Sequence, residues 1–262
     1  MALIKSIFLS VSIIFELFLL TQSQTDYCDK SLCPNGLPHV ACGKVGEFGP
    51  ACPADKKLIN MTEELKVYIL DLHNKFRARV ASGQVQGFEP ATKMPTLVWD
   101  DELQYLSELN VKTCIYGHDP CRNTAKYKLV GQNIAANSFF GMDFSPLDTI
   151  TELITSWCGE YENANQQFVD NYPGLGFDPP RDIGHFAQIA SDRTVSMACA
   201  MVQYTQNEGG QDWVHQNFVC DYSSSHVRQK PVYEKGPTCT KCITGCNPVY
   251  PGLCNIGEPV AL

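Results

Sequence analysis

The chain has 262 residues, of which 44% are hydrophobic, and a formal net charge of −8 at pH 7. This length is sufficient to bury a sizeable core, and it predicts one large domain with room for a small appendage. The acidic balance argues against nucleic acid or heparin as the main partner, because such binding depends on Lys and Arg that neutralise phosphate or sulfate.

The N-terminal segment has the pattern of a signal peptide. Lys5 precedes a nearly continuous apolar run that ends at Leu20, and small or polar residues follow it. A membrane anchor is the weaker alternative, because polar residues interrupt the run at Ser10, Ser12 and Glu16. We therefore expect residues 1–23 to be removed and the mature chain to be secreted, with no later segment that spans a membrane.

All 13 cysteines lie after this segment. In a secreted chain they predict a disulfide framework, and the odd number leaves at least one thiol unpaired or paired between chains. Residues 24–60 show no helical or strand periodicity and form a cysteine-rich arm with Cys28, Cys33, Cys42 and Cys52. Asn60 begins an Asn-Met-Thr sequon, which makes it a candidate glycosylation site on a surface loop.

Three helices are predicted after the arm. Residues 62–80 carry apolar side chains at helical spacing behind an N-cap threonine. A second helix spans residues 100–113, and a third starts at Ser145-Pro146, where serine suits the cap and proline the first turn. His73 flanks the apolar stripe of the first helix, and we interpret it as a hydrogen-bonded packing residue.

Three strands are predicted in the second half of the chain, over residues 185–190, 195–201 and 216–222. A turn over residues 208–211 separates the last two strands. Each of these two strands carries one cysteine on a patterned face, which suggests a disulfide between Cys199 and Cys220.

Residues 226–262 form a short tail in which helical and strand patterns fade. It holds four closely spaced cysteines, Cys239, Cys242, Cys246 and Cys254. Zinc is one interpretation of this spacing, but export to an oxidising space favours two disulfides. Their pairing stays open among three arrangements.

Four polar side chains, far apart in sequence, are candidates for lining one cavity: His118, Gln132, Glu160 and His185. Glu160 extends the buried face of the third helix, so its carboxylate needs a cation, a metal, a donor or water unless the helix end is exposed. Zinc accepts neutral imidazole nitrogens, so His118 and His185 are the candidate metal ligands, with Glu160 as a third ligand or the holder of a bound water. A weakly bound zinc and an empty polar cavity are the two alternatives, and no cofactor is required.

Five short motifs follow one another in the chain: His73-Asn74-Lys75-Phe76-Arg77, Tyr116-Gly117-His118-Asp119-Pro120-Cys121, Gly131-Gln132-Asn133-Ile134, Gly184-His185-Phe186-Ala187-Gln188 and Phe218-Val219-Cys220-Asp221-Tyr222. On these motifs the chain resembles the CAP superfamily (cysteine-rich secretory proteins, antigen 5, pathogenesis-related 1), most closely insect venom allergen 5-like proteins. The resemblance implies an α+β fold, a three-layer α-β-α sandwich with a central antiparallel sheet. This domain would occupy residues 61–225, between the arm and the tail.

The resemblance also implies the disulfides Cys28–Cys42, Cys33–Cys121, Cys52–Cys114 and Cys199–Cys220. Cys158 is then the odd thiol, which we interpret as a buried small hydrophobe and not as a nucleophile. The cavity tetrad of the family, two histidines and two glutamates, falls on His118, Glu160, His185 and, for the second acid, Gln132. An amide at this last position can neither act as an acid nor add negative charge to a metal. Ser191 stands where the family usually has Trp.

Three functions follow from these observations. The first is a non-enzymatic, monomeric binding protein of saliva, venom, haemolymph or reproductive fluid, whose partner is an extracellular protein or a small apolar, sterol-like ligand. The second is a metal-dependent hydrolase that uses His118, Glu160 and His185, which the absence of Gly-x-Ser-x-Gly and His-Glu-x-x-His motifs and the missing carboxylate disfavour. The third is a channel or receptor modulator that acts through the cysteine-rich tail.

Overall fold

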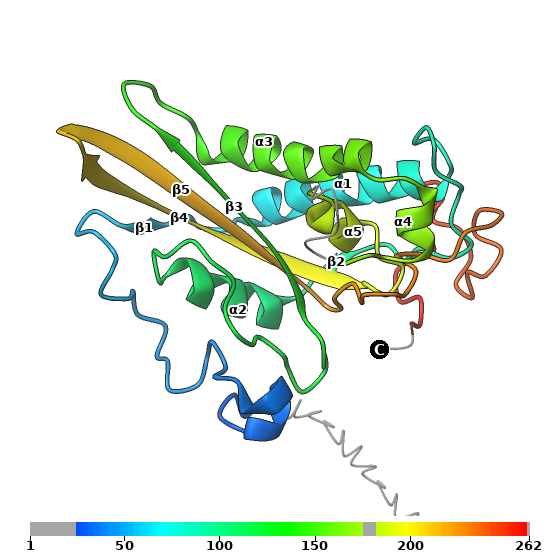
Figure 1. The fold of residues 1–262 in the computed structure, drawn as a ribbon, viewed down its shortest axis with the longest axis horizontal. Helices are drawn as coiled ribbons and strands as arrows, with labels where there is room; N and C mark the ends of the chain where they lie inside the picture. Colours follow the sequence, from blue (N-terminus) through cyan, green and yellow to red (C-terminus); the bar gives the residue numbers. More distant parts are fainter. Residues whose placement is uncertain (1–24, 175–181, 261–262) are drawn as a thin grey trace, which may run out of the picture.

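A central sheet lies between two helical layers in the computed structural model, which describes residues 25–174 and 182–260 (Figure 1). Helices α1 (Glu63–Ala81) and α3 (Pro146–Gly159) cover one face of the sheet, and α2 (Asp101–Val111) covers the other. The expected α-β-α sandwich is confirmed. The predicted signal peptide, residues 1–23, lies outside the described residues, and no described helix is long and apolar enough to cross a membrane.

The sheet has five strands, and its two longest form the central hairpin. Strand β4 (Ser196–Glu208) pairs with β5 (Gln211–Tyr222), and β5 also pairs with β3 (Gly131–Phe139), both antiparallel. Two short strands complete the sheet along β4: β1 (Lys57–Leu58), antiparallel, and β2 (Val98–Trp99), parallel. Gly209 and Gly210 have φ of 61° and 84°, as a tight two-residue hairpin turn requires, so the predicted turn is confirmed.

The three predicted helices form because each begins with a side chain that caps its first turn. Thr62 accepts the N–H of Leu65 before α1, and serine and aspartate caps start α3 and α2. The shorter elements are α4 (Gln166–Asp170), α5 (Gly184–Ile189) and the 3₁₀ turns η1 (Lys30–Leu32), η2 (Pro34–Gly36) and η3 (Glu160–Asn163). Observed and predicted bounds of the first two long helices agree within two residues, and the third helix starts where it was predicted.

The prediction of a strand over residues 185–190 is wrong, because this segment is helix α5. Its apolar side chains Phe186, Ala187 and Ile189 are all buried, and a short apolar run cannot by itself distinguish a strand from a buried helix. Strand β3 was not predicted. Its first residues are buried and polar, including Gln132 and Asn133, so they lack the alternation that marks a half-buried strand.

Six disulfides hold the arm, the sheet and the tail. The structure forms the four bonds that the resemblance implies. In the tail it pairs Cys239 with Cys246 and Cys242 with Cys254, and Cys158 remains free. The tail is also bound to the body of the domain, where the N–H of Cys254 donates to the carbonyl of Met94 at 2.8 Å. Asn60 is exposed just before α1, and its glycosylation stays a prediction.

Helix α1 is fixed to the sandwich by polar side chains on its buried face. His73 donates through Nδ1 to the carbonyl of Ile69 (2.8 Å) and accepts the Tyr222 hydroxyl at Nε2 (3.0 Å), so its interpretation as a packing residue is confirmed. Arg77 is completely buried and donates to four backbone carbonyls, those of Pro95, Ile189, Ser191 and Thr194. Burial lowers the pKa of Arg77 to about 9.

Replacement of this guanidinium should destabilise the whole domain. Arg77→Met keeps an unbranched side chain but leaves buried carbonyls without donors, so we expect the free energy of unfolding to fall by about 3 kcal/mol or more. At this chain length, that loss corresponds to a fall of roughly 6 °C or more in Tm. Arg79→Met, on the exposed face of the same helix, is the matched control and should change stability by no more than about 0.5 kcal/mol. Equal effects of the two substitutions would contradict this role of Arg77.

Candidate functional site

One polar cavity of about 150 Å³ gathers all four side chains that the sequence nominated. It is lined by His118, Gln132, Asn133, Glu160, Asp182, Gly184, His185 and His226. The lining comes from five parts of the chain: the loop after α2, strand β3, the end of α3, the start of α5 and the loop after β5. Sequence reasoning missed Asp182 and His226, because neither belongs to a motif that carried the resemblance.

His118 is held by the amide of Gln132. The Nε2 atom of Gln132 donates to Asp119 Oδ2 (2.8 Å) and Asp221 Oδ1 (2.9 Å), and carboxylate oxygens can only attract the NH₂ side of an amide. Gln132 Oε1 therefore faces His118 and accepts from its Nδ1 at 2.8 Å. Burial is the main cause that lowers the pKa of His118, so the ring is neutral at physiological pH and its Nε2 carries a lone pair.

His185 is held by the carboxylate of Glu160. Its Nδ1 donates to Glu160 Oε1 at 2.5 Å, and Trp157 stacks on its ring at 5.4 Å between centroids. Glu160 Oε2 accepts the backbone N–H groups of His185 (2.8 Å) and Phe186 (3.1 Å), at the N-terminus of α5. Both oxygens of Glu160 are thus engaged within the protein. The carboxylate orients His185 and caps the start of α5. Of the partners that the sequence analysis considered for Glu160, the structure therefore provides hydrogen-bond donors.

His226 is the third imidazole of the cavity and is held in a similar way. Its Nδ1 lies 3.3 Å from Gln188 Oε1, and Gln188 Nε2 donates to the carbonyl of Ser224 at 2.7 Å, which fixes the orientation of this amide. A Cβ at Gly131 would lie 2.1 Å from Gln188 Oε1, so only glycine leaves room for Gln188 here. Burial lowers the pKa of His226 to about 4, and this ring is also neutral.

The cavity offers imidazole nitrogens to a metal, but no closed set of three ligands. Metal-binding histidines typically donate the other ring N–H to a carboxylate, a carbonyl or water, as His118 and His185 do to Gln132 and Glu160. This arrangement leaves Nε2 of His118 and of His185 as the ring nitrogen available to a metal. Within residues 25–174 and 182–260, the cavity contains no three His, Cys, Asp or Glu ligand atoms that all lie within 4.8 Å of one another.

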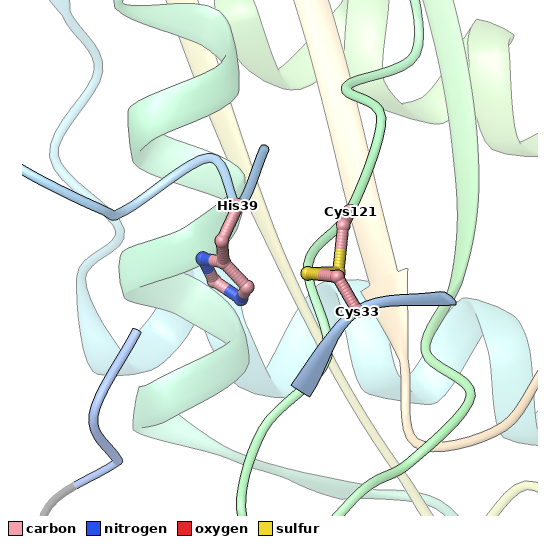
Figure 2. Close-up of side chains that lie close together, drawn as sticks. All are labelled: Cys33, His39 and Cys121. Carbon is pink, nitrogen blue, oxygen red and sulfur yellow. A yellow bond between two sulfur atoms is a disulfide. The ribbon is translucent and has the colours of Figure 1, made fainter. Parts of the chain in front are cut away.

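The described residues include one such cluster elsewhere, Cys33, His39 and Cys121, shown in Figure 2. It is not suited to a metal, because the two sulfur atoms are joined in a disulfide. Both nitrogens of His39 are also engaged: Nε2 donates to the carbonyl of Asn123 (2.7 Å), and Nδ1 accepts the N–H of Ala41 (3.0 Å). This cluster fastens the arm to the domain.

A larger cavity, of about 420 Å³, lies where the arm meets the start of α2. Its carboxylates are used structurally. Asp100 caps α2 through Oδ1 and accepts the Tyr127 hydroxyl through Oδ2, and Glu102 Oε1 accepts the hydroxyls of Thr25 and Tyr27. We therefore place the candidate functional site in the histidine cavity.

Cys158 does not provide a nucleophile. Burial raises the pKa of its thiol to about 12, so the reactive thiolate is scarce at physiological pH. No hydrogen bond joins this thiol to a histidine in the described part of the chain. Its side chain packs against the apolar core, as expected of a packing residue, but it is half-buried and not fully buried.

Comparisons with known proteins point to one family. Residues 70–222 match the family model described as CAP, the cysteine-rich secretory protein family. The chain is 42% identical over 235 residues to venom allergen-1 of Aedes albopictus, covering 90% of this chain and 89% of that protein. It is 35% identical to venom allergen 5 of Vespa velutina, covering 80% and 99% of the two chains. The solved structure of NaASP2 with Zn²⁺ aligns with a TM-score of 0.57 and 28% identity over 78% of this chain and 100% of that one.

The close approach at Gly131 gives a prediction about packing behind the cavity. Gly131→Ala should displace Gln188 and lower the free energy of unfolding by about 1–3 kcal/mol, as overpacking of a filled interior does. Gly159→Ala is the matched control, because no atom of another element lies within 4 Å of the place that its Cβ would take, and it should be close to neutral. Urea denaturation compares the two variants, and a neutral Gly131→Ala would contradict the packing argument.

The buried carboxyl of Asp221 predicts a pH dependence. Burial and the nearby Asp119 raise the pKa of Asp221 to about 7. A folded-state pKa above the unfolded value stabilises the protein fully below the unfolded pKa, and this stabilisation is lost as pH rises through about 7. The Tm of Asp221→Asn minus the Tm of the native protein, measured from pH 4.5 to 8, should therefore increase as pH rises. A difference in Tm that stays constant over this range would refute the prediction.

Proposed function

This chain belongs to the CAP family of cysteine-rich secretory proteins, and we propose that it is a secreted, non-enzymatic protein whose histidine cavity binds a divalent transition metal weakly. The observation that carries the proposal is the shared arrangement of His118 and His185. Each donates its Nδ1–H to a fixed acceptor and keeps Nε2 free of protein partners in the described chain. Two neutral imidazoles suit zinc, and water would complete its coordination.

Secretion is supported by three independent features. The chain starts with a segment that has the composition of a signal peptide. Six disulfides are typical of proteins that fold and work in an oxidising space. The similar proteins of Aedes and Vespa are named as venom allergens.

A hydrolase receives less support from the same geometry. The carboxylate expected to act as a base, Glu160, has both oxygens engaged by His185 and Phe186. The thiol of Cys158 is protonated at physiological pH because burial raises its pKa. A cysteine hydrolase needs a thiol in contact with a base, and Cys158 and Glu160 do not supply such a pair.

A small apolar ligand receives little support from the apolar pocket beside the histidine cavity's short helix α5. One apolar pocket between α4 and α5, lined in part by Phe168, Tyr172 and Phe186, has a volume of about 10 Å³. This is about the space of a single water molecule and far below that of a sterol. A protein partner is the second candidate, and the tail favours it, because Ile243, Val249 and Ile256 are 77%, 73% and 64% exposed.

Zinc binding tests the proposal directly. We expect the native protein to take up one zinc ion that a chelator removes, His185→Ala to weaken the affinity more than tenfold, and Glu160→Gln to weaken it about 10–100-fold through the orientation of His185. His215→Ala removes an imidazole from the sheet outside the cavity and should leave the affinity unchanged. Competition with a zinc-binding dye measures these affinities.

Native mass spectrometry of the protein from its own secretion, before and after chelation, complements this titration. It reports bound metal, retained ligand, glycan and disulfide count in one spectrum. If the native protein binds no zinc, or if His185→Ala binds as well as the native protein, the proposed metal site is wrong. A bare protein would then direct attention to the outer surface and the tail.

A further inference from the structure

A cluster of charged side chains lies behind the cavity, on the far side of Gln132. Arg122 Nε donates to Asp119 Oδ1 at 2.7 Å and lies 3.9 Å from Asp221 Oδ1. The side chain of Asp221 is fully buried, and its Oδ2 has no hydrogen-bond partner among the described residues. Two carboxylates thus share one guanidinium, and Asn110 Nδ2 also donates to Asp119 Oδ2 at 2.9 Å.

The NH₂ group of Gln132 adds one donor to each carboxylate. Its two hydrogens point at Asp119 and Asp221, with Nε2 at 2.8 and 2.9 Å from their oxygens. The reverse orientation would place the amide oxygen against both carboxylates, which repels and forms no hydrogen bond. Asp221 Oδ1 accepts from Gln132 in either protonation state, because a proton on Oδ2 leaves Oδ1 free. The orientation of the amide is therefore the same whether Asp221 is ionised or carries a proton on Oδ2.

We propose that Asp221, together with Asp119, is a positioning residue of the cavity: the two carboxylates hold the Gln132 amide in one orientation, and this amide fixes His118 as the Nδ1–H tautomer. Neither carboxylate needs to touch the ligand. The inference rests on the proposed metal binding, because the Nδ1–H tautomer leaves Nε2 of His118 unprotonated for a metal. It also gives a physical reason for an amide at position 132, where a glutamate would set a third carboxylate against Asp119 and Asp221.

Nitrogen NMR of the histidine rings in metal-free protein tests the tautomer. In the native protein, His118 should show a protonated Nδ1 and an unprotonated Nε2. Asp221→Asn should keep this state, because Asp119 still requires the NH₂ side of the amide. Asp119→Asn with Asp221→Asn removes both acceptor-only partners and should yield a mixture of tautomers. A protonated Nε2 in neutral His118 of the native protein, or a single Nδ1–H tautomer in the double variant, would overturn the proposal.

A stability cycle keeps the proposal testable if that double variant fails to fold. At pH 7.5, Gln132→Glu should lower Tm by about 5 °C, because three carboxylates then compete for one guanidinium. Adding Asp221→Asn supplies an NH₂ donor to the new carboxylate and should restore Tm to within about 2 °C of the native value. Losses that simply add would show that positions 132 and 221 are not coupled. Neither measurement uses zinc, so their failure is distinct from failure of the metal proposal.

Discussion

The short helix α5 is held at its two ends by groups of opposite charge, a half-buried carboxylate and a buried guanidinium, and the cavity depends on these two contacts. The Glu160 carboxylate accepts the first N–H groups of the helix, and the Arg77 guanidinium binds carbonyls at and beyond its last turn. Each charge lies where the helix dipole favours it. A six-residue helix has little stability of its own. The places of His185 and Gln188 are therefore set by α1, which carries Arg77, and by η3 directly after α3, which carries Glu160.

The sheet side of the cavity is fixed by a second set of polar contacts. Asn133 Nδ2 donates to the Tyr222 hydroxyl at 3.2 Å, and this hydroxyl donates to His73 on α1 at 3.0 Å. Asn133 also contacts the carbonyl of His185 at 3.3 Å, so β3, β5, α1 and α5 meet in one hydrogen-bonded chain. Many of the polar motif residues thus bond to one another and join the layers of the sandwich. The motif side chains that remain to face a ligand are mainly imidazoles.

The sequence predicted local structure where one side chain determines it, and missed structure that depends on distant contacts. Helix starts were predicted well, because each cap acts within its own first turn. Helix α5 was mistaken for a strand, since its conformation depends on Arg77 and Glu160 from elsewhere in the chain. The four cavity residues could be named by resemblance, but the third imidazole, His226, lies on a loop without a pattern. No local signal marks Asp221 as buried beside Gln132, because their strands pair only in the folded sheet.

The unpaired Cys158 has a consequence for the order in which the disulfides are completed. Once α3 is packed, burial raises the pKa of this thiol to about 12, and a protonated thiol does not attack disulfides. In the unfolded chain its pKa is that of an ordinary thiol, so it competes with the other twelve cysteines for every partner. Packing of α3 against the sheet therefore removes the competitor from exchange. Formation of the core therefore protects the six native pairs from attack by Cys158.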